Sequence, residues 1–376
     1  MRVALVHDWL TGYRGGERVL RHLARRYPTA DLYTLIHQPG SVPSEIEDRR
    51  IFTSPLDRIP GRARHYRKLL PLFPWAIRRF DLRGYDLVLS TSHAVAKSVR
   101  VAEGTAHLDY CFTPMRYVWD HADSYLGQGL RRKLATPMIH ALRRFDVGTS
   151  GPDSVTRFVA ISTDVAGRIR RHYDRPARVV PPPVAIDWIE TAREPAHDYY
   201  LLVGGFVPYK REDLAIDAFR RLDRRLVIAG HGPGRARLER SAPANVEFVG
   251  RVDEARLAAL YRDCRALIYP QHEDFGLIAV EAQAAGRPVI GFGAGGLLDT
   301  VRPLPERDSD LCDLEATGVF FDEQTPQALR GAIERFEKHE ERFEPRALRR
   351  WAERFSPERF DAALDQEIAA AMGSVR

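Results

Sequence analysis

Short apolar runs alternate with amphipathic segments along almost the whole chain. The runs are about four to seven residues long, a length that suits strands buried on both faces of a sheet. We expect strands at residues 2–7, 31–36, 85–90, 108–113, 157–162, 199–205, 266–269, 288–292 and 318–321, and a strand with its following turn or loop at 226–233 and at 246–252. Repeated strand–helix alternation builds parallel sheets. The predicted fold class is therefore α/β, with two Rossmann-like domains that face each other across a cleft.

The division between the two expected domains lies near a run of three prolines. Because Pro181–Pro183 cannot continue a central strand, the segment 178–184 is interpreted as a stiff connector. The strand–helix alternation starts again at Tyr199. We therefore predict an N-terminal domain at 1–183, a C-terminal domain at 199–355 and a further helix at 356–376.

Length and composition fit a soluble globular protein of two domains. The chain has 376 residues, of which 44% are hydrophobic and 29% are charged, as in ordinary soluble domains. No apolar run approaches the ~18 residues that span a bilayer, and the apolar stretch at the N-terminus is too short for a signal peptide. The three cysteines, Cys111, Cys264 and Cys312, form no Cys-x-x-Cys pair. We therefore expect a cytoplasmic protein without a metal site.

Basic residues are concentrated in the first half of the chain. Residues 1–195 hold 31 Lys and Arg against 20 Asp and Glu, a net charge of +11, and residues 196–376 hold 26 against 31, a net charge of −5. The N-terminal half should therefore face an anionic partner. The sequence has no zinc-finger or RRM signature, so we expect no nucleic acid. An anionic membrane surface or a lipid diphosphate fits the charge as well.

The segment 58–83 is the strongest candidate for such a surface. It interleaves basic residues with apolar ones, as do segments that lie among lipid headgroups. Pro71 and Pro74 should break any long helix here. A solvated helix pair that covers the core of the first domain is the alternative interpretation. The basic members are Arg62, Arg64, Arg67, Lys68, Arg78, Arg79 and Arg83, and the apolar members are Tyr66, Leu69, Leu70, Leu72, Phe73, Trp75 and Phe80.

The stretch His272–Glu281 is the most informative for function. It follows a predicted strand and opens a segment, 278–285, that is apolar or small except for Glu281 and Gln283. A carboxylate on a buried helix needs a polar partner. Glu273 precedes the helix at the carboxyl end of a strand, where α/β sheets bind ligands. Carboxylates suit hydroxyl groups and a helix N-terminus suits phosphate, so we predict a nucleotide-sugar site. A glutamate paired with a core arginine is the alternative.

Other polar positions also follow predicted strands. Gly15 and Gly16 lie at a strand-to-helix junction, where backbone can approach a phosphate. Because their loop is not G-x-G-x-x-G, a dinucleotide-dependent dehydrogenase loses its main support. His93 should open a helix at the edge of the sheet where ligands bind. Lys210 and Arg211 precede a helix, and cations at that position favour an anionic partner.

The loop after the strand at 108–113 combines aromatic rings with charged groups. Its members Arg116, Tyr117 and Asp120 suit contacts with a sugar acceptor. Packing of the same loop on the core of the domain is the alternative interpretation.

The region around Glu273 and Glu281 also carries a family resemblance. Two glutamates separated by seven residues, with Phe275-Gly276 between them and AAGRPVI at 284–290, resemble the signature of retaining GT-B glycosyltransferases of family 4. The resemblance implies that Glu281 binds the ribose hydroxyls and that Glu273 binds sugar hydroxyls and orients the anomeric carbon. It also implies that the last helix crosses back onto the first domain.

The resemblance implies roles for further residues. His93 would contact the donor sugar, and the backbone of Arg251 and Val252 would hold the nucleotide base. Amides and cations would hold the donor diphosphate, and they belong to Phe275, Gly276, Leu277, Lys210, Gly15 and Gly16. No cofactor or metal is implied, because the protein's own cations and amides replace it.

One position departs from the family pattern. The family usually has an arginine directly after the strand matched here by 199–205, and Gly205 stands in its place. The family lysine that follows is matched by Lys210. One phosphate contact is therefore in doubt, and Arg211 is the candidate replacement.

Within the family, the chain is similar to bacterial mannosyltransferases of surface-polysaccharide assembly. The similarity is carried by residues 7–10, 113–120 and 207–211. It implies GDP-mannose as donor and a polyprenyl-diphosphate-linked or saccharide acceptor. It further implies a peripheral position on the cytoplasmic face of the anionic inner membrane.

Three other functions remain open from the sequence. A nucleotide-sugar 2-epimerase of the same fold would not need the basic surface at 58–83. A non-catalytic nucleotide-sugar-binding partner subunit is suggested only by Gly205. A nucleic-acid binder would show strongly salt-dependent binding without donor turnover.

Overall fold

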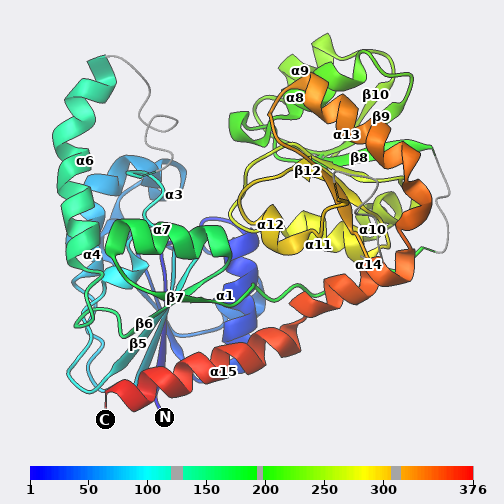
Figure 1. The fold of residues 1–376 in the computed structure, drawn as a ribbon. Coiled ribbons are helices and arrows are strands. Elements are labelled where there is room, and N and C mark those ends of the chain that lie inside the picture. The colour runs from blue at the N-terminus through cyan, green and yellow to red at the C-terminus, as the bar shows by residue number, and fades with distance from the viewer. Residues whose placement is uncertain (120–129, 193–197, 306–314, 376) are drawn as a thin grey trace. The chain divides into compact units, whose positions relative to one another are not determined.

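The computed structural model describes residues 1–119, 130–192, 198–305 and 315–375. The chain divides into two compact units (Figure 1). The N-terminal unit contains Met1–Pro183 and Phe360–Arg376, and the C-terminal unit contains Val184–Arg359. Each unit is built around its own parallel sheet, as the strand–helix alternation predicts.

The sheet of the N-terminal unit has seven strands in the order β3-β2-β1-β4-β5-β6-β7. These strands are β1 Val3–His7, β2 Asp31–Thr34, β3 Ile51–Thr53, β4 Leu87–Ser92, β5 Ala106–Cys111, β6 Arg157–Ala160 and β7 Ala177–Val179. Every residue of β1, β4 and β5 is buried, as is typical of strands in a parallel sheet. The register pairs His7 of β1 with Thr91 of β4, so the loops that follow these two strands are neighbours.

Helices of the N-terminal unit connect and cover its strands. They are α1 Gly15–Arg26, α2 Ser44–Glu47, α3 Arg62–His65, α4 Phe73–Ile77, α6 Leu130–Gly148, α7 Thr163–Tyr173 and, from residue 360, α15 Pro357–Ser374, with the 3₁₀ helices η1 Pro55–Arg58, η2 Tyr66–Leu72 and η3 Ala96–Ser98. Arg26 of α1 lies 2.8 Å from Asp361, and Arg157 of β6 lies 2.8 Å from Glu367. These ion pairs attach α15 to α1 and to the sheet.

The sheet of the C-terminal unit has six strands in the order β10-β9-β8-β11-β12-β13. These strands are β8 Tyr199–Gly204, β9 Arg225–Gly230, β10 Val246–Gly250, β11 Leu267–Tyr269, β12 Val289–Phe292 and β13 Gly318–Phe321. The helices are α8 Glu212–Phe219, α9 Arg235–Ser241, α10 Glu254–Asp263, α11 Leu277–Ala284, α12 Leu297–Thr300, α13 Pro326–Lys338 and α14 Pro345–Ala352, with the 3₁₀ helices η4 Pro208–Lys210, η6 Glu340–Arg342 and η7 Glu353–Phe355. Helix α11 is buried from Ala279 to Ala284, as its apolar sequence predicts.

The structure corrects three local predictions. The connector predicted at 178–184 begins inside β7, which pairs only with β6 and is therefore an edge strand that the prolines can follow. The short edge strand β3 escaped the analysis of apolar runs because it has only three residues. His93 lies in a bend and opens no α-helix, since the next element is η3.

The segment 58–83 is broken into short helical pieces, as Pro71 and Pro74 predict. Tyr66, Leu70, Phe73 and Phe80 belong to the buried core of the unit. Leu72 and Trp75 remain 46% and 51% exposed. The segment therefore covers the core and also presents apolar side chains to solvent.

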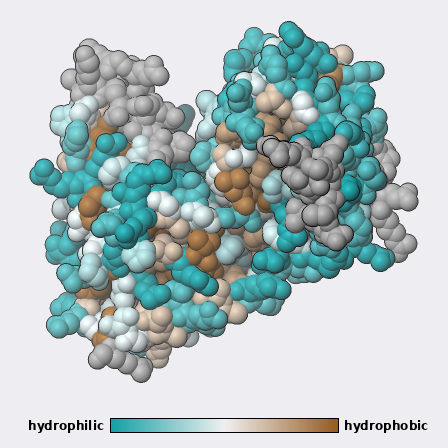
Figure 2. Space-filling view, viewed as in Figure 1, coloured by the Kyte–Doolittle hydropathy of each residue, from teal (hydrophilic) through white to brown (hydrophobic). Residues whose placement is uncertain are grey.

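Hydrophilic residues cover most of the molecular face seen in Figure 2, and hydrophobic residues gather there in small, separate patches. Among the described residues, no helix combines the length and apolarity needed to cross a membrane.

Candidate active site

Glu273 and Lys210 form an ion pair at the carboxyl end of the C-terminal sheet. Glu273 follows β11, and its Oε1 contacts Lys210 Nζ. The Oη of Tyr269, the last residue of β11, donates a hydrogen bond to Glu273 Oε2 at 2.6 Å. Burial by itself would lower the pKa of Lys210, but the Glu273 carboxylate outweighs burial and raises that pKa. Lys210 therefore stays a cation, although its side chain is only 13% exposed.

Two residues with left-handed backbone bring Lys210 to this position. Phe206 has φ 46° and Arg211 has φ 55°, a region that side-chain-bearing residues rarely adopt. The buried carboxylate of Glu212 accepts a hydrogen bond from the Phe206 N–H at 2.8 Å. This bond folds residues 206–211 into the turn that carries Lys210.

Glycines at the end of β9 and just after it allow the turn after β8 to pack backbone against backbone. A Cβ on Gly230 would lie 1.9 Å from the carbonyl oxygen of Gly204, and one on Gly232 would lie 1.9 Å from that of Gly205. No side chain can occupy either position without a shift of backbone. The backbone at Gly230 and Gly232 therefore restrains the start of the Lys210 turn, as Glu212 also does.

The N-terminus of α11 lies directly after Glu273. Gly276 caps the helix with φ 100°, which favours glycine. Within the described residues, the N–H groups of Phe275, Gly276 and Leu277 donate no hydrogen bond to protein. These amides and the Lys210 ammonium form a group of donors that suits an anion.

Glu281 lies four residues into the same helix and is 3% exposed. The hydroxyl of Tyr261, on α10, donates a hydrogen bond to Glu281 Oε2 at 2.9 Å. This bond supplies the polar partner that a buried carboxylate requires.

His93 is the central polar side chain of the N-terminal unit. Its Nδ1 lies 3.2 Å from Asp8 Oδ2, and its side chain is 20% exposed. Burial lowers the pKa of His93 to about 4, although the Asp8 carboxylate opposes the shift. The imidazole is therefore neutral near pH 7.

Gly15 and Gly16 form the first turn of α1. The Arg14 N–H donates to the Glu17 carboxylate at 2.9 Å, which closes a capping interaction at this helix start. A Cβ on Gly16 would lie 3.3 Å from the ring of Phe112. A side chain at Gly16 would thus press on Phe112.

The other predicted donor-site residues lie in loops of the C-terminal unit. The Arg211 guanidinium lies 3.3 Å from Asp213 and 3.4 Å from Gln324. Arg251 is exposed and Val252 half-buried in the loop before α10. A Cβ on Gly205 would meet nothing within 4 Å, so the structure leaves space for a side chain at the position of the family arginine.

The predicted acceptor residues have different surroundings. The Arg116 N–H donates to the His93 carbonyl oxygen at 3.3 Å. Tyr117 is 6% exposed and belongs to the core of the N-terminal unit, with its ring 6.1 Å from that of Trp9. Asp120 lies outside the described residues. Contact of these residues with an acceptor stays a prediction.

Four residues that contact the predicted site residues, or the turn that carries one of them, were not predicted from the sequence. They are Tyr269 beside Glu273, Tyr261 beside Glu281, Glu212 beside the Lys210 turn and Asp8 beside His93. Asp8 carried a usable signal, because it directly follows a buried strand. The two tyrosines carried none, since a buried tyrosine more often serves packing.

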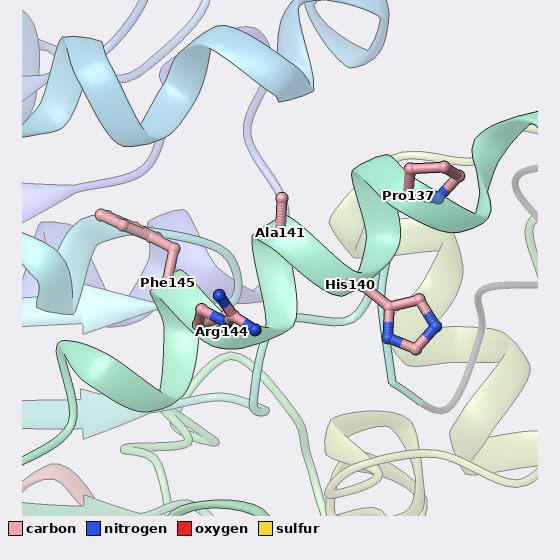
Figure 3. A pocket seen from close by; sticks show the side chains of 5 residues that line it. All are labelled: Pro137, His140, Ala141, Arg144 and Phe145. Atoms are coloured by element: carbon pink, nitrogen blue, oxygen red, sulfur yellow. The ribbon is translucent and has the colours of Figure 1, made fainter.

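Two hollows lie elsewhere on the units. The larger has a volume of about 490 Å³ and is lined by α6 residues Pro137, His140, Ala141, Arg144 and Phe145, whose side chains Figure 3 shows along the helix. The smaller has a volume of about 210 Å³ and lies between Trp188, Glu190 and α10. Among the described residues that line them, none is a predicted site residue.

The two parallel sheets, each with its own helices, allow the fold to be compared with those of solved structures. The chain resembles sucrose-phosphate synthase from Thermosynechococcus elongatus with a TM-score of 0.69 and 18% identity, over 100% of both chains. It resembles HepE of Anabaena, solved in complex with UDP, with a TM-score of 0.69 and 14% identity, over 98% of this chain and 100% of that one. The fold is α/β of the GT-B type.

Sequence comparison finds a matching family and several relatives, each over part of the chain. Residues 189–354 match the model of the family described as glycosyl transferases group 1. A GDP-mannose-dependent alpha-(1-6)-phosphatidylinositol dimannoside mannosyltransferase of Mycobacterium tuberculosis is 33% identical over 175 residues, 44% of this chain and 42% of that protein. A GDP-mannose-dependent alpha-mannosyltransferase of Mycolicibacterium smegmatis is 42% identical over 103 residues, 27% of each. O-antigen chain mannosyltransferase C of Escherichia coli is 32% identical over 115 residues, 29% of this chain and 30% of that protein.

These matches span less than half the length of the curated relatives. The chain has the GT-B fold, and its match to the glycosyl transferases group 1 family covers residues 189–354, less than half of its length. The similarities do not favour the epimerase or the non-catalytic binder.

Proposed function

We propose that this protein is a retaining glycosyltransferase that moves a hexose from a nucleotide-diphosphate sugar to an acceptor hydroxyl. The observation that carries the proposal is the grouping of Lys210, Glu273 and the free amides of the α11 N-terminus within a glycosyl transferases group 1 domain. Cation and amides suit a diphosphate, and a carboxylate suits sugar hydroxyls. Glu281, four residues into the buried helix, is the proposed partner of the ribose hydroxyls.

The charge on the leaving group explains the need for these donors. The acceptor oxygen bonds to the anomeric carbon while the bond from that carbon to the diphosphate oxygen breaks. Negative charge develops on the diphosphate, where Lys210 and the amides of residues 275–277 stabilise it. The acceptor proton passes to a diphosphate oxygen on the same face, which retains the anomeric configuration. The proposal requires no metal or cofactor, because these donors supply the positive charge.

Lys210 and Glu273 must separate, at least in part, when the donor binds. Lys210 would turn from the carboxylate to a phosphate oxygen, and Glu273 would turn to the sugar. Tyr269 keeps its hydrogen bond to the other carboxylate oxygen, so Glu273 does not lose its orientation. Gly15, Gly16 and His93 of the N-terminal unit are proposed to complete the donor contacts.

GDP-mannose is the proposed donor. The support is the similarity of part of the chain to relatives whose names specify GDP-mannose. The proposed acceptor is a polyprenyl-diphosphate-linked or other saccharide of a bacterial surface polysaccharide, in line with the O-antigen relative. HepE was solved with UDP, so uridine donors are the main competitors to test.

An anionic membrane surface is the proposed location of the acceptor. Leu72 and Trp75 protrude from the segment 58–83, and the Arg79 guanidinium lies 5.3 Å from the Trp75 ring. Arg67 and Lys68 are exposed in the same segment. Exposed Trp and Leu next to cations suit the headgroup region of anionic lipids. The protein would then be peripheral on the cytoplasmic face of the membrane.

The test is binding and hydrolysis of a panel of GDP-, UDP-, ADP- and TDP-sugars by the wild type and Glu281→Gln. We expect one donor to bind, and the variant to lose roughly 10- to 100-fold in affinity, as when a hydrogen bond to a charged group is removed. Glu337→Gln is the matched control, because Glu337 also accepts a hydrogen bond from a buried tyrosine, Tyr200, at 2.7 Å. Failure of every donor to bind would overturn the proposed function.

A further inference from the structure

The smaller of the two hollows belongs wholly to the C-terminal unit and contains none of the residues proposed to bind the donor. Its volume of about 210 Å³ is about seven times the ~30 Å³ that one water molecule occupies in the liquid, which leaves room for a single sugar ring. The residues that line it are Trp188 and Glu190 of the segment 184–192 and Ala255, Ala258, Ala259 and Arg262 of α10.

The backbone on both sides of Trp188 is anchored to the unit. The Trp188 indole N–H donates to the Ala185 carbonyl oxygen at 3.0 Å. Arg349, on α14, donates to the carbonyl oxygens of Ile186 and Ile189 at 3.3 and 2.8 Å, and both isoleucine side chains are buried. The indole is therefore held in position beside α10, which lowers the entropy cost of binding a ligand against it.

Helix α10 supplies the other wall of the hollow with small side chains. Ala255, Ala258 and Ala259 are spaced i, i+3 and i+4, so they share one face of the helix. Their methyl groups leave open the space that larger side chains would fill. An indole together with small apolar groups suits the C–H face of a pyranose ring.

The hollow carries one acid and one base among its lining residues. Glu190 is exposed, and Arg262 donates from Nε and one Nη to the Asp263 carboxylate at 2.8 and 3.1 Å, which fixes the plane of the guanidinium. Asp263 and, more weakly, Glu190 raise the pKa of Arg262. The two lining charges cancel and Asp263 adds an acid, so an anion such as phosphate is disfavoured. A neutral ligand whose hydroxyl groups both donate and accept suits this set of groups.

We propose that this hollow is a saccharide-binding site, in which one pyranose ring stacks on Trp188 and its hydroxyl groups contact Glu190 and Arg262. The choice of a saccharide rests in part on the proposed function, in which the protein adds hexoses to a polysaccharide. A chain bound here stays with the enzyme after one transfer, which raises its effective concentration for the next. The site takes the saccharide itself and needs no nucleotide or diphosphate.

Binding is tested without any donor, on the full chain, by calorimetric titration with α-mannotriose and with maltotriose. At least one of them should bind the wild type, and Trp188→Ala should weaken this binding about tenfold, because the stacking surface is lost. Ala258→Phe keeps every polar group but fills the hollow, and it should abolish binding. The two variants act in opposite ways on the same space, so if one does not fold, the other decides.

Two control variants match these changes. Trp75→Ala removes an indole that is 51% exposed on the N-terminal unit, and it should leave saccharide binding unchanged. Glu190→Gln should weaken binding roughly three- to tenfold, as when a hydrogen bond to a charged group is lost. Its control is Glu247→Gln, because Glu247 is also exposed in the C-terminal unit but lies outside the hollow and pairs with Arg225 at 3.1 Å.

Donor hydrolysis, measured in parallel, separates this inference from the proposed function. Trp188→Ala should hydrolyse the donor at the rate of the wild type. Failure of both trisaccharides to bind the wild type, or binding that survives both Trp188→Ala and Ala258→Phe, would overturn the saccharide site and leave the proposed function standing. Trisaccharide binding that depends on Trp188, in a protein that hydrolyses no donor, would instead overturn the proposed function and leave the site.

Discussion

At the scale of single residues, Glu273 is shared between two partners with different roles. Lys210 neutralises one oxygen, and Tyr269 donates to the other from a position that is 1% exposed. The proposed reaction needs Lys210 to leave the carboxylate, while Glu273 turns toward the sugar and keeps its hydrogen bond to Tyr269. A hydrogen bond from a buried hydroxyl at the end of β11 restrains the orientation of this carboxylate.

Tyr269→Phe removes this orientation and leaves the ring in place. We expect kcat to fall about 10- to 100-fold, the equivalent of a hydrogen bond to a charged group, and the free energy of unfolding to fall by about 1–2 kcal/mol. The variant is compared with the wild type by initial rates with the best donor and by urea unfolding.

Tyr200→Phe is the control for Tyr269→Phe. Tyr200 is equally buried in the same sheet and donates to Glu337 at 2.7 Å. It should lose a similar free energy of unfolding and keep its kcat. Equal losses of kcat in both variants would mean that Tyr269 acts only through stability.

Asp109 is a buried acid in the N-terminal sheet with an altered pKa. Burial raises its pKa to about 7 from an ordinary value of 3.8, although hydrogen bonds from Ser90 and Ser92 oppose the shift. The folded protein therefore holds this proton more tightly than the unfolded chain does. Its contribution to stability is complete below about pH 4 and is lost as the pH rises through about 7.

Asp109→Asn removes this loss, because asparagine resembles the protonated acid. The difference in free energy of unfolding between the variant and the wild type should increase, in favour of the variant, by roughly 2–3 kcal/mol from pH 5 to pH 8. Urea unfolding of both proteins at the two pH values measures the gain. His107 contributes equally to both proteins, so its own titration cancels. A difference that does not change with pH would contradict the raised pKa.

At the scale of secondary structure elements, the turns after β8 and β9 depend on glycine for a reason that strand propensity does not reveal. The carbonyl groups of Gly204 and Gly205 occupy the space where Cβ atoms of Gly230 and Gly232 would be. Two loops can thus meet without side chains between them. Because the Lys210 turn begins at the same glycines, the interlock also places the proposed diphosphate contact.

Gly232→Ala should break this interlock. A Cβ 1.9 Å from the Gly205 oxygen forces backbone to move, which we expect to lower the free energy of unfolding by about 2–4 kcal/mol. Gly331→Ala is the control within the same unit, because Gly331 lies inside α13 with nothing within 4 Å of its Cβ position. It should stabilise the protein by about 0.5–1 kcal/mol. Urea unfolding measures both changes in the free energy of unfolding. If Gly232→Ala stabilises the protein as Gly331→Ala should, the contact does not restrain the turns.

At the scale of the whole molecule, charge is unequally divided. The first 195 residues carry +11 and the rest −5. Part of the excess lies in the segment 58–83, whose one acid, Asp81, lies 2.7 Å from Arg83, while Asp57, just before the segment, lies 2.7 Å from Arg62. Exposed cations of the same segment, such as Arg79 against the Trp75 ring, suit an external anion.

Removal of three of these cations tests the proposed membrane surface. Arg67→Ala/Lys68→Ala/Arg79→Ala should bind vesicles with anionic phosphatidylserine about 100-fold more weakly than the wild type, since each cation near the surface contributes about 1 kcal/mol. Binding should also weaken with salt and be lost on neutral phosphatidylcholine vesicles. Sedimentation of the vesicles measures it.

The control removes the same charge from the C-terminal unit. Arg221, Arg237 and Arg240 are exposed there, and their replacement by Ala should leave vesicle binding within about twofold. Equal loss in both triple variants would attribute the binding to net charge and contradict a specific surface.

Much of the fold could be predicted from the sequence, because it follows from short-range patterns. Runs rich in apolar residues marked every strand in the described part of the chain except the three-residue edge strands β3 and β7. Pro71 and Pro74 broke the segment 58–83 as expected. The motif at Glu273 and Glu281 was placed on a strand end and a buried helix, since both depend on neighbouring residues alone. The roles of the predicted site residues remain predictions.

The tertiary structure decided which side chains support the predicted ones. Asp8 and His93 are 85 residues apart, and they meet because β1 and β4 are neighbours in a register that pairs His7 with Thr91. Likewise, Tyr261 reaches Glu281 only because α10 packs on α11. The sequence by itself determined where strands, turns and charged motifs lie along the chain. Which distant groups share a proton or a hydrogen bond depends on strand order and register, and these are set by the packing of the whole sheet.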